Sequence, residues 1–374
     1  MLQRILSKLI IFLKAKKIIL PPKKNNLIII DQAGSDKIID LILKHEECSI
    51  LDVRGESVNL FILLFSLFYL RAGKYAYKVS YLKYTGAKFA ITFVDTSYWL
   101  SDLFKFLPSC KLALIQNGRV AHTRFLNIPT RSLKCDYYFV NGNDWGQYAE
   151  KYIQAKFVAI GSIIGNSFPI AKLQPVKKIV WVSQYRPPFV GQNTNVPINY
   201  NDWTKSDSYA LKILEDYCVN NKLSFEILGV LGSNDEFKHY KNIINKFDFV
   251  STNKHSEPYS NYNISNDVIV TGVDSQLQYE LFAMGFRTAF FNTRGFFVGN
   301  KSYRFAWPHA TDDFGLFWAN IPDDAQVVNI LDFLKHVEEK EWNSLVEENR
   351  HVIDYDANNE LIRNCLKNEN IRID

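Results

Sequence analysis

The chain has 374 residues, a formal net charge of +5, and 47% hydrophobic against 22% charged residues. This length predicts two domains, at about 100–200 residues each, and the composition excludes a disordered or low-complexity chain. The five cysteines form no CxxC pair, which argues against a disulfide framework or structural zinc site and indicates a reducing compartment. The small net charge does not by itself indicate binding to nucleic acid.

Positive charge is concentrated at the N-terminus, where residues 1–24 hold seven Lys or Arg residues and no acid. On a helix, six apolar residues would share one face: Leu2, Ile5, Leu6, Leu9, Ile10 and Leu13. This pattern predicts a basic amphipathic helix over 1–24 that lies on an anionic membrane surface, on the inner face of the cell membrane. The alternative is a helix packed on its own domain. A cleavable signal peptide is not expected, because basic residues recur through the segment.

The longest apolar run is residues 60–70. It is shorter than the roughly 18 residues that a transmembrane helix needs. We therefore expect no transmembrane helix, and a buried helix at this position.

Short β-rich runs alternate with helical runs through the chain. Strands are predicted at residues 26–31, 48–53, 89–94, 112–115, 137–140, 157–160, 178–182, 225–230, 267–271 and 288–292. Helices are predicted at 36–44, before Leu70, and at 75–84, 97–106, 144–154, 207–220, 234–246, 277–284 and 325–339, with two further helical segments after that. The alternation predicts an α/β fold with parallel sheets.

Gly165, Pro169 and Pro175 mark a linker over 162–177. We predict two Rossmann-like domains, over 25–165 and 176–335, with a cleft between them, and C-terminal helices over 336–374.

Ligands of open α/β sheets bind beyond the carboxyl ends of the strands, so the polar residues at those ends are the candidates. In the first half they include Arg54, Glu56, Asp95, Gln116, Asn117 and Arg119; in the second half they include Ser183, Gln184, Arg186, Gly272, Asp274 and Ser275.

The strongest local pattern spans residues 267–285. A strand runs into Gly272, and Asp274 and Ser275 open a helix whose first N–H groups favour a phosphate. Gln276 lies in the first turn. Glu280, about one turn further on, is placed to accept hydrogen bonds from ribose hydroxyls. The alternative is an ordinary capped helix with a solvated Glu280.

These features resemble GT-B glycosyltransferases and, more narrowly, the bacterial surface-carbohydrate biosynthesis family. The matching stretches are Arg54-Gly55-Glu56, residues 91–95, Ile115-Gln116-Asn117-Gly118, and residues 160–162, 273–280, 289–294, 305–308 and 317–320. That family is similar in layout to transferases that move Kdo or related ulosonic acids from CMP donors in lipopolysaccharide and capsule assembly. Some of those enzymes carry Glu-Asp-Gly and His-Pro motifs. This chain has Gln116-Asn117-Gly118 and the reversed Pro308-His309 instead.

The resemblance implies a glycosyltransferase that takes a nucleotide-activated sugar donor and a glycan or glycolipid acceptor. We recognise no Asp-x-Asp motif of the GT-A type, so we expect an enzyme that needs no metal ion or cofactor, and we expect no binding to nucleic acid. Glycosyl transfer passes through an oxocarbenium-like transition state, and it needs a general base or a carboxylate nucleophile. We predict Asp95 as this carboxylate, Glu56 as second choice, and Asn117 as a residue that holds an acceptor hydroxyl or a donor carboxylate. Asp95 could instead cap the helix that starts near Ser97, and Glu56 could pair with Arg54.

The acceptor is expected in the N-terminal domain, with Arg54, Gln116 and Arg119 as ligands. The nucleotide is expected in the C-terminal domain, bound by Ser183, Gln184, Arg186, Gly272, Asp274, Ser275, Gln276, Glu280 and His309. Arg186, Arg287, Arg294 and the first helical turn after Ser275 would balance the charge of the donor phosphate. A buried structural role is the alternative for His309.

Two other functions stay open. A CDP-polyol phosphotransferase of cell-surface polymer synthesis would use histidines in the cleft, and His122 and His309 lie near predicted strand ends. A non-catalytic, two-lobed nucleotide- or sugar-binding protein would normally be exported, whereas the sequence shows no convincing signal peptide.

Overall fold

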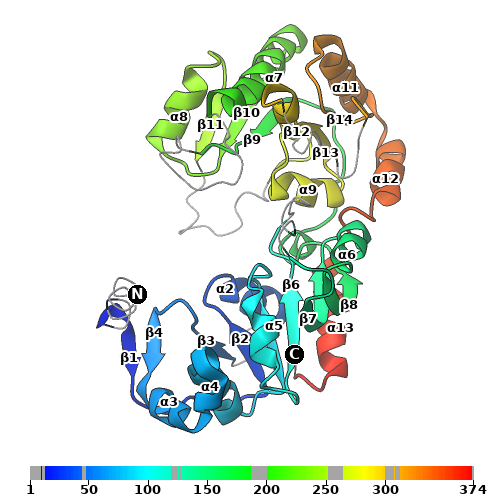
Figure 1. Ribbon diagram of the computed structural model, residues 1–374. Helices are drawn as coiled ribbons and strands as arrows, with labels where there is room; N and C mark the ends of the chain where they lie inside the picture. Colours follow the sequence, from blue (N-terminus) through cyan, green and yellow to red (C-terminus); the bar gives the residue numbers. More distant parts are fainter. Residues whose placement is uncertain are drawn as a thin grey trace. The chain divides into compact units, whose positions relative to one another are not determined.

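The chain folds as two compact units, each described here by itself (Figure 1). The computed structural model describes residues 10, 13–43, 48–118, 125, 128–186, 200–251, 264–299, 307 and 312–372, with the side chains of 200–203 left aside. Unit 1 comprises Met1–Ser167 and Asp356–Asp374, and unit 2 comprises Phe168–Tyr355. Each unit holds one six-stranded parallel sheet, which confirms the predicted pair of Rossmann-like domains. The cleft predicted between them stays a prediction.

The sheet of unit 1 has the strand order β3-β2-β5-β6-β7-β8. Its strands are β2 (Leu27–Ile30), β3 (Ser49–Leu51), β5 (Phe89–Thr92), β6 (Lys111–Ile115), β7 (Leu133–Val140) and β8 (Ile153–Ala159). The chain passes from β2 to β3 on one side and then returns to place β5 on the other side of β2. The order of strands therefore reverses between β2 and β5, and such a reversal is where doubly wound sheets bind ligands.

Helices cover both faces of this sheet, which explains why every residue of its central strands β2 and β5 is buried. Ile28 and Ile30 of β2 face a cluster that also contains residues of α3 (Leu60–Phe65), α4 (Ala76–Thr85), α5 (Trp99–Phe104) and α6 (Asn143–Ala149). Leu27 and Ile29 point to the opposite face, where α2 (Ser35–Ile38), the π-helix η1 (Ile39–Leu43) and α13 (Glu360–Asn368) pack.

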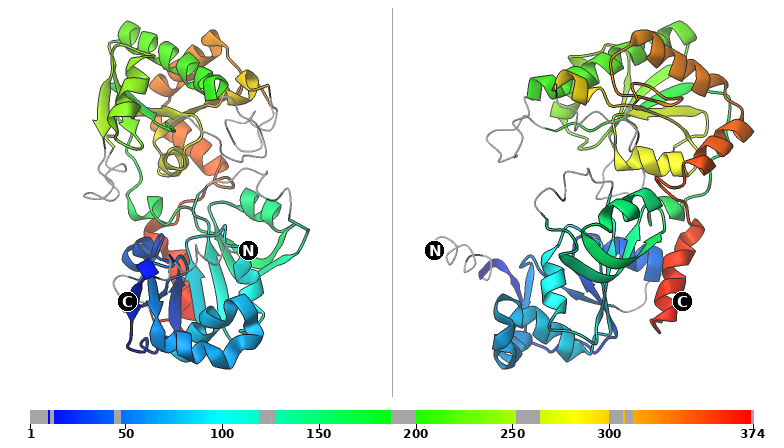
Figure 2. Two further views of the ribbon diagram at one scale, coloured as in Figure 1. Left: turned by 60° about the vertical axis from the view of Figure 1, so that its left-hand side comes forward. Right: turned by 45° about the vertical axis from the view of Figure 1, so that its right-hand side comes forward.

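The predicted C-terminal helical region divides between the two units. The helix α12 (Glu339–Glu348) belongs to unit 2, whereas α13 returns to unit 1. Ile362 and Leu366 of α13 are fully buried against the sheet of unit 1, and the right view of Figure 2 shows this helix, in red, along that unit. The second face of the sheet needs an apolar cover, which explains why the C-terminus returns.

Unit 2 repeats the same topology, with the order β11-β10-β9-β12-β13-β14. Its strands are β9 (Lys178–Val182), β10 (Ser224–Gly229), β11 (Asp248–Ser251), β12 (Val268–Gly272), β13 (Arg287–Phe291) and β14 (Trp318–Ala319); its other helices are α7 (Tyr200–Asn221), α8 (Asn234–Lys241), α9 (Gln276–Ala283), α10 (Arg294–Phe297) and α11 (Asp324–His336). The strand order reverses between β9 and β12. The short elements β11, β14 and α10 were not predicted from the sequence.

The N-terminal segment differs from the predicted helix over 1–24. Lys16–Ile18 forms β1, which pairs in parallel with β4 (Ser57–Asn59) in a separate two-stranded sheet. The β-branched residues 18 and 19 and the prolines at 21 and 22 favour an extended chain over a helix here. Most of residues 1–12 lie outside the described part of the chain. Of the predicted apolar face, Ile10 and Leu13 are described, and both are exposed.

The apolar segment after β4 also differs from its prediction as a buried helix. Among the described residues, Leu60–Thr85 is the one helical stretch long and apolar enough to cross a membrane, judged by length and composition alone. It is not a straight helix: α3 passes into the 3-10 helix η2 (Ser66–Tyr75), where Tyr69 and Gly73 leave helical geometry, and then into α4. Only 28% of its apolar window is buried.

Gly34, at the start of α2, allows a close backbone approach. Its φ is +75°, and a Cβ there would lie 2.5 Å from Cδ1 of Phe93. Gly86 has the same φ of +75°, but a Cβ there would meet nothing within 4 Å. We therefore expect Gly34→Ala to lower the free energy of unfolding by roughly 1–3 kcal/mol more than Gly86→Ala, because only the first adds overpacking to backbone strain. Urea unfolding of the two variants measures the difference, and equal losses would contradict the predicted clash.

Candidate active site

The carboxyl ends of β9, β12 and β13 bring together polar residues that are distant in sequence. Gln184 follows β9, Asp274 follows β12, and Asn292 and Arg294 follow β13. This edge contains the reversal of strand order in unit 2, where the nucleotide was predicted. Most of the predicted nucleotide ligands therefore lie at one edge of one sheet.

Arg294 connects these strand ends. Its side chain is only 4% exposed. Nη1 donates a 2.9 Å hydrogen bond to Oε1 of Gln184 and lies 3.6 Å from Oδ1 of Asp274. Nη2 lies 3.5 Å from Oδ1 of Asp207, on α7. Burial raises the pKa of Asp207, and the charge of Arg294 opposes that rise. Two carboxylates therefore balance Arg294, which orients Gln184 and Asp274 instead of acting mainly as a phosphate ligand.

The start of α9 is held in place by Gln278. Its Oε1 accepts a 3.0 Å hydrogen bond from the N–H of Ser275, the N-cap residue, and its Nε2 donates to the carbonyl of Ala289 in β13 at 3.1 Å. A Cβ at Gly272 would lie 2.6 Å from this Oε1. Gly272 therefore makes room for Gln278. The first N–H groups of α9, which have no acceptor within the helix, lie at the carboxyl edge of the sheet and suit an anion.

Glu280 is buried one turn into α9. It is 3% exposed, and its Oε1 accepts a 3.0 Å hydrogen bond from Nε2 of Gln276. The alternative of a solvated Glu280 is therefore wrong. Glu280 and Gln276 form an adjacent carboxylate and amide on the helix that starts at the reversal of strand order.

Ser183 has a different environment from the one predicted. Its hydroxyl donates to Glu236, accepts from the hydroxyl of Tyr240 at 2.7 Å, and accepts from the N–H of Tyr185 at 3.1 Å. Glu236 is fully buried and accepts three further hydrogen bonds of 2.8–2.9 Å from the N–H groups of residues 230–232. Ser183 therefore belongs to a network that fixes the turn before α8. Sequence reasoning missed Glu236, although the pattern Ser233-x-x-Glu236 is that of a capped helix start.

The three arginines expected near the donor phosphate occupy different positions. Arg186 is exposed just beyond β9, at the edge where the other candidates lie. Arg287 begins β13, at the opposite edge of the sheet, and donates to the carbonyls of Gln174 and Val337. Burial lowers its pKa. The phosphate role predicted for Arg287 is therefore wrong, whereas Arg186 is an exposed cation among the described residues of this edge. Arg119, His122 and His309 lie outside the described residues.

In unit 1, Arg54 pairs with a residue that the sequence analysis did not select. Its Nε lies 2.9 and 2.8 Å from the two carboxylate oxygens of Asp31, which follows β2 and is buried. Asp31 has a φ of 81°, which is unusual for a residue other than glycine. The alternative in which Arg54 forms an ion pair with Glu56 is therefore wrong. Asp31 could have been selected as a candidate from the sequence, as Asp95 was, because it directly follows an apolar strand.

Glu56 interacts instead with Asp52. The hydrogen bond to Asp52, followed by burial, raises the pKa of Glu56. Burial tends to raise the pKa of Asp52, but hydrogen bonds from Glu56 and from the N–H groups of Ser57, Arg54 and Gly55 outweigh it and lower this pKa. The exposed Glu56 is therefore the more basic carboxylate of the two.

Asp95 lies just beyond β5, beside the reversal of strand order in unit 1. It is 2% exposed, and its Oδ2 accepts a 2.6 Å hydrogen bond from the hydroxyl of Tyr138. Nε1 of Trp145 donates to the same hydroxyl at 3.3 Å. The helix α5 has Tyr98 as its N-cap residue, with no capping bond from a side chain. Asp95 therefore does not cap α5, contrary to the alternative prediction.

The two candidates after β6 differ in exposure. Gln116 is buried: Oε1 accepts from the N–H of Asn141 at 2.8 Å, and Nε2 donates to the carbonyl of Gly118 at 3.1 Å. Asn117 is exposed. Gln116 therefore shapes the loop, whereas the Asn117 side chain is accessible to solvent.

The described residues hold no group of three or more His, Cys, Asp or Glu side chains placed to bind a metal ion. The expectation that the chain lacks an Asp-x-Asp motif is wrong, because it contains the triplet Asp354-Tyr355-Asp356. Asp354 accepts from the N–H of Tyr355, and Asp356 accepts from the N–H of Leu361 at the start of α13. Both carboxylates are thus engaged with the local backbone.

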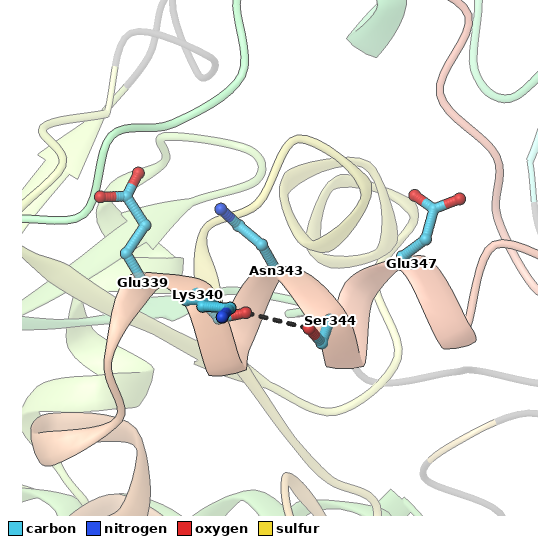
Figure 3. Close-up of a pocket in the computed structure, with 5 residues that line it drawn as sticks. All are labelled: Glu339, Lys340, Asn343, Ser344 and Glu347. Atoms are coloured by element: carbon cyan, nitrogen blue, oxygen red, sulfur yellow. Dashed lines mark hydrogen bonds between the residues drawn. The ribbon is translucent and has the colours of Figure 1, made fainter.

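Several cavities on the described surface lie away from the candidate residues of unit 2. Figure 3 shows one of about 610 Å³ along α12, lined only by Glu339, Lys340, Asn343, Ser344 and Glu347. Another, of about 600 Å³, lies at the amino ends of β2 and β3. Because a single helix lines the first and the second lies at the opposite edge of its sheet from Asp95, neither is a candidate active site.

The Ser183–Glu236 network leads to a stability prediction. Glu236→Gln would turn an amide NH₂ toward backbone N–H donors and remove charge-assisted hydrogen bonds. We expect the free energy of unfolding to fall by roughly 2–4 kcal/mol. Glu226→Gln, which removes a partly exposed ion pair with Lys178, should cost about 1 kcal/mol or less. Chemical denaturation compares the two variants, and equal losses would rule out the structural role of Glu236.

Comparisons with known proteins agree with this architecture. A family model described as "putative O-antigen biosynthesis protein" matches residues 113–370. No curated protein matches the sequence. A UDP-GlcNAc 2-epimerase from Neisseria meningitidis, solved with UDP-GlcNAc bound, is 12% identical, with 94% of this chain and 100% of that chain covered and a TM-score of 0.51. A glycosyltransferase from Rickettsia africae ESF-5 is 11% identical, with 95% and 98% covered and a TM-score of 0.50. At these identities the likeness shows the fold alone.

The family match covers more than half of the chain and includes the carboxyl-edge residues of unit 2. The chain therefore belongs to the family described as "putative O-antigen biosynthesis protein", and it is built from the two Rossmann-like domains of the GT-B fold.

Proposed function

We propose that this protein is a metal-independent GT-B glycosyltransferase that moves a sugar from a nucleotide donor onto a surface polysaccharide or lipid-linked glycan. The family description supports a role in O-antigen biosynthesis, and the fold that the chain shares with the Rickettsia glycosyltransferase supports sugar transfer. The single observation that carries the proposal is the buried Glu280 on α9, at the reversal of strand order in unit 2.

Unit 2 binds the nucleotide in this proposal. Glu280 accepts hydrogen bonds from ribose hydroxyls, and its burial makes each of these bonds worth more than in water. The first turn of α9 and the exposed Arg186 meet the phosphate charge. The Neisseria epimerase, which has the same fold, was solved with a nucleotide sugar bound, and this supports a donor of that class. In the finer form of the proposal the donor is a CMP-linked ulosonic acid such as Kdo.

Unit 1 binds the acceptor and supplies the catalytic carboxylate. We assign that role to Asp95, because it lies beside the reversal of strand order, where a ligand of this sheet is expected. Tyr138 holds one oxygen of Asp95 at 2.6 Å and so fixes the direction of the carboxylate. Glu56 follows the edge strand β3 and shares a hydrogen bond with Asp52, which makes it the second choice. Asn117 orients the acceptor hydroxyl or the donor carboxylate.

Glu280→Ala tests the nucleotide site. We expect the affinity for the preferred nucleotide among CMP, UDP, GDP and dTDP to fall by roughly 1.5–3 kcal/mol, because hydrogen bonds to a charged group are lost. Calorimetry on the purified protein measures the change. Glu347→Ala is the matched control, because it removes an exposed carboxylate from α12 in the same unit. Unchanged affinity in a folded Glu280→Ala protein would remove Glu280 from the site.

Asp95→Asn tests the catalytic assignment. The amide keeps the size of the side chain but cannot act as a base, so turnover should fall by roughly 10²–10⁴-fold while nucleotide affinity stays the same. Tyr138→Phe should lower turnover less, because it removes only the positioning hydrogen bond. Near-normal turnover in Asp95→Asn together with a large loss in Glu56→Gln would move the assignment to Glu56.

Product analysis separates this function from the competing ones. Transfer of polyol phosphate from a CDP-polyol would establish the phosphotransferase. Release of an epimerised donor without an acceptor would indicate an epimerase. Tight nucleotide binding without turnover of any activated donor would favour a non-catalytic binding protein.

A further inference from the structure

We propose that one apolar face of unit 1 docks onto the surface of an anionic phospholipid bilayer. The face consists of exposed apolar residues on three neighbouring segments, which are the chain after β1, helix α3 and the 3-10 helix η2. Its members are Ile19, Leu20, Phe61, Leu63, Leu64, Leu67, Phe68 and Leu70. The proposal concerns unit 1 alone and does not depend on the assignment of Asp95 or Glu280.

The exposure of these side chains is large and local. Leu64, Leu67, Phe68 and Leu70 are 62–81% exposed, and Ile19 and Leu20 are 75% and 77% exposed. Between Leu60 and Leu70 only Ile62 and Ser66, four residues apart, are buried. Contiguous apolar surface of this kind is rare on proteins that meet only water, and it marks an interaction site.

The three segments form one continuous surface because Asn59 joins them. Its Nδ2 donates a 2.7 Å hydrogen bond to the carbonyl of Leu20, and its Oδ1 accepts from the N–H of Ile62 at the start of α3 at 3.0 Å. β1 pairs with β4, and β4 leads directly into α3. Figure 1 shows β1, β4, α3 and α4 gathered at one end of unit 1.

The geometry favours a surface that lies in the bilayer interface over a helix that crosses it. The chain bends within η2, where Gly73 has a φ of 55°. α4 then packs back on α3: the centre of the Tyr84 ring lies 4.9 Å from that of Phe61 and 5.6 Å from that of Phe65. Because Val79 and Leu82 of α4 are buried in the core, α4 anchors this face to the unit.

Charge identifies the occupant as an anionic lipid surface. No Asp or Glu occurs between Glu56 and Asp95, whereas five Lys or Arg residues do, and residues 1–30 hold seven such cations without an acid. Lys16, Lys17, Arg71 and Lys74 are exposed on the segments that carry the face or adjoin it. An apolar centre beside cations suits anionic headgroups over an acyl boundary. A second copy of the chain would instead bring like charges together.

The experiment compares two variants of the full chain. Leu64→Ser/Leu67→Ser/Phe68→Ser removes the centre of the face, and Leu231→Ser/Leu316→Ser removes two exposed leucines, 52% and 55% exposed, from unit 2. Both are tested for co-sedimentation with phosphatidylcholine vesicles that contain or lack phosphatidylglycerol. The first variant should lower the partition coefficient onto anionic vesicles at least about tenfold, because buried apolar area drives the association. The second should match the parent protein.

Arg71→Glu/Lys74→Glu provides a separate variant that keeps the apolar residues, in case the triple variant does not fold. It should weaken binding to anionic vesicles and reduce the salt dependence of that binding, but leave binding to pure phosphatidylcholine unchanged. Three results would overturn the proposal. They are unchanged binding in a folded triple variant, equal loss in the unit 2 control, and a lipid-free dimer of the parent protein that the triple variant abolishes.

Discussion

Helices cover both faces of the two parallel sheets, and this double cover determines where polar chemistry is placed. A strand buried on both faces consists mainly of apolar residues, so its polar side chains gather where it ends. The strand order reverses between β2 and β5 in unit 1 and between β9 and β12 in unit 2. Helical cover separates at that point, so a ligand of such a sheet is expected there. Asp95 follows β5 in unit 1, and Asp274 and Ser275 follow the equivalent strand β12 in unit 2.

The two sites solve the problem of buried charge in different ways. In unit 2 the buried Arg294 is balanced by Asp207 and Asp274, so the network fixes side-chain directions and carries little excess charge. In unit 1 the carboxylates are distributed over three strand ends, and each has its own donor: Arg54 for Asp31, backbone N–H groups for Asp52, and Tyr138 for Asp95. Such an arrangement holds several acids in one region without direct repulsion between all of them.

The apolar face of unit 1 departs from the burial pattern of the rest of the molecule. Elsewhere long apolar runs enter the core, whereas within residues 60–70 only Ile62 and Ser66, four positions apart, are buried. A surface that binds a soluble partner would ordinarily have a rim of charges of both signs. The segment between Glu56 and Asp95 contains cations only. The same segment supplies α4, whose inner side is part of the core of unit 1. Removal of this segment would therefore cost the unit part of its core as well as the exposed face.

The sequence by itself determined the alternation of strands and helices, the two Rossmann-like domains and the edge of each sheet on which candidate residues lie. These features follow from local periodicity and from polar residues that end apolar runs, such as Asp95 after 89–94 and Ser275 after 267–272. Only the tertiary structure decided which side chains and segments contact one another. Arg54 bonds Asp31 and not Glu56, Ser183 belongs to a buried network with Glu236, Arg287 lies at the opposite edge, and α13 covers unit 1. Each of these outcomes depends on which residues from distant segments come within hydrogen-bonding or packing distance, and a single sequence carries no local signal for that distance.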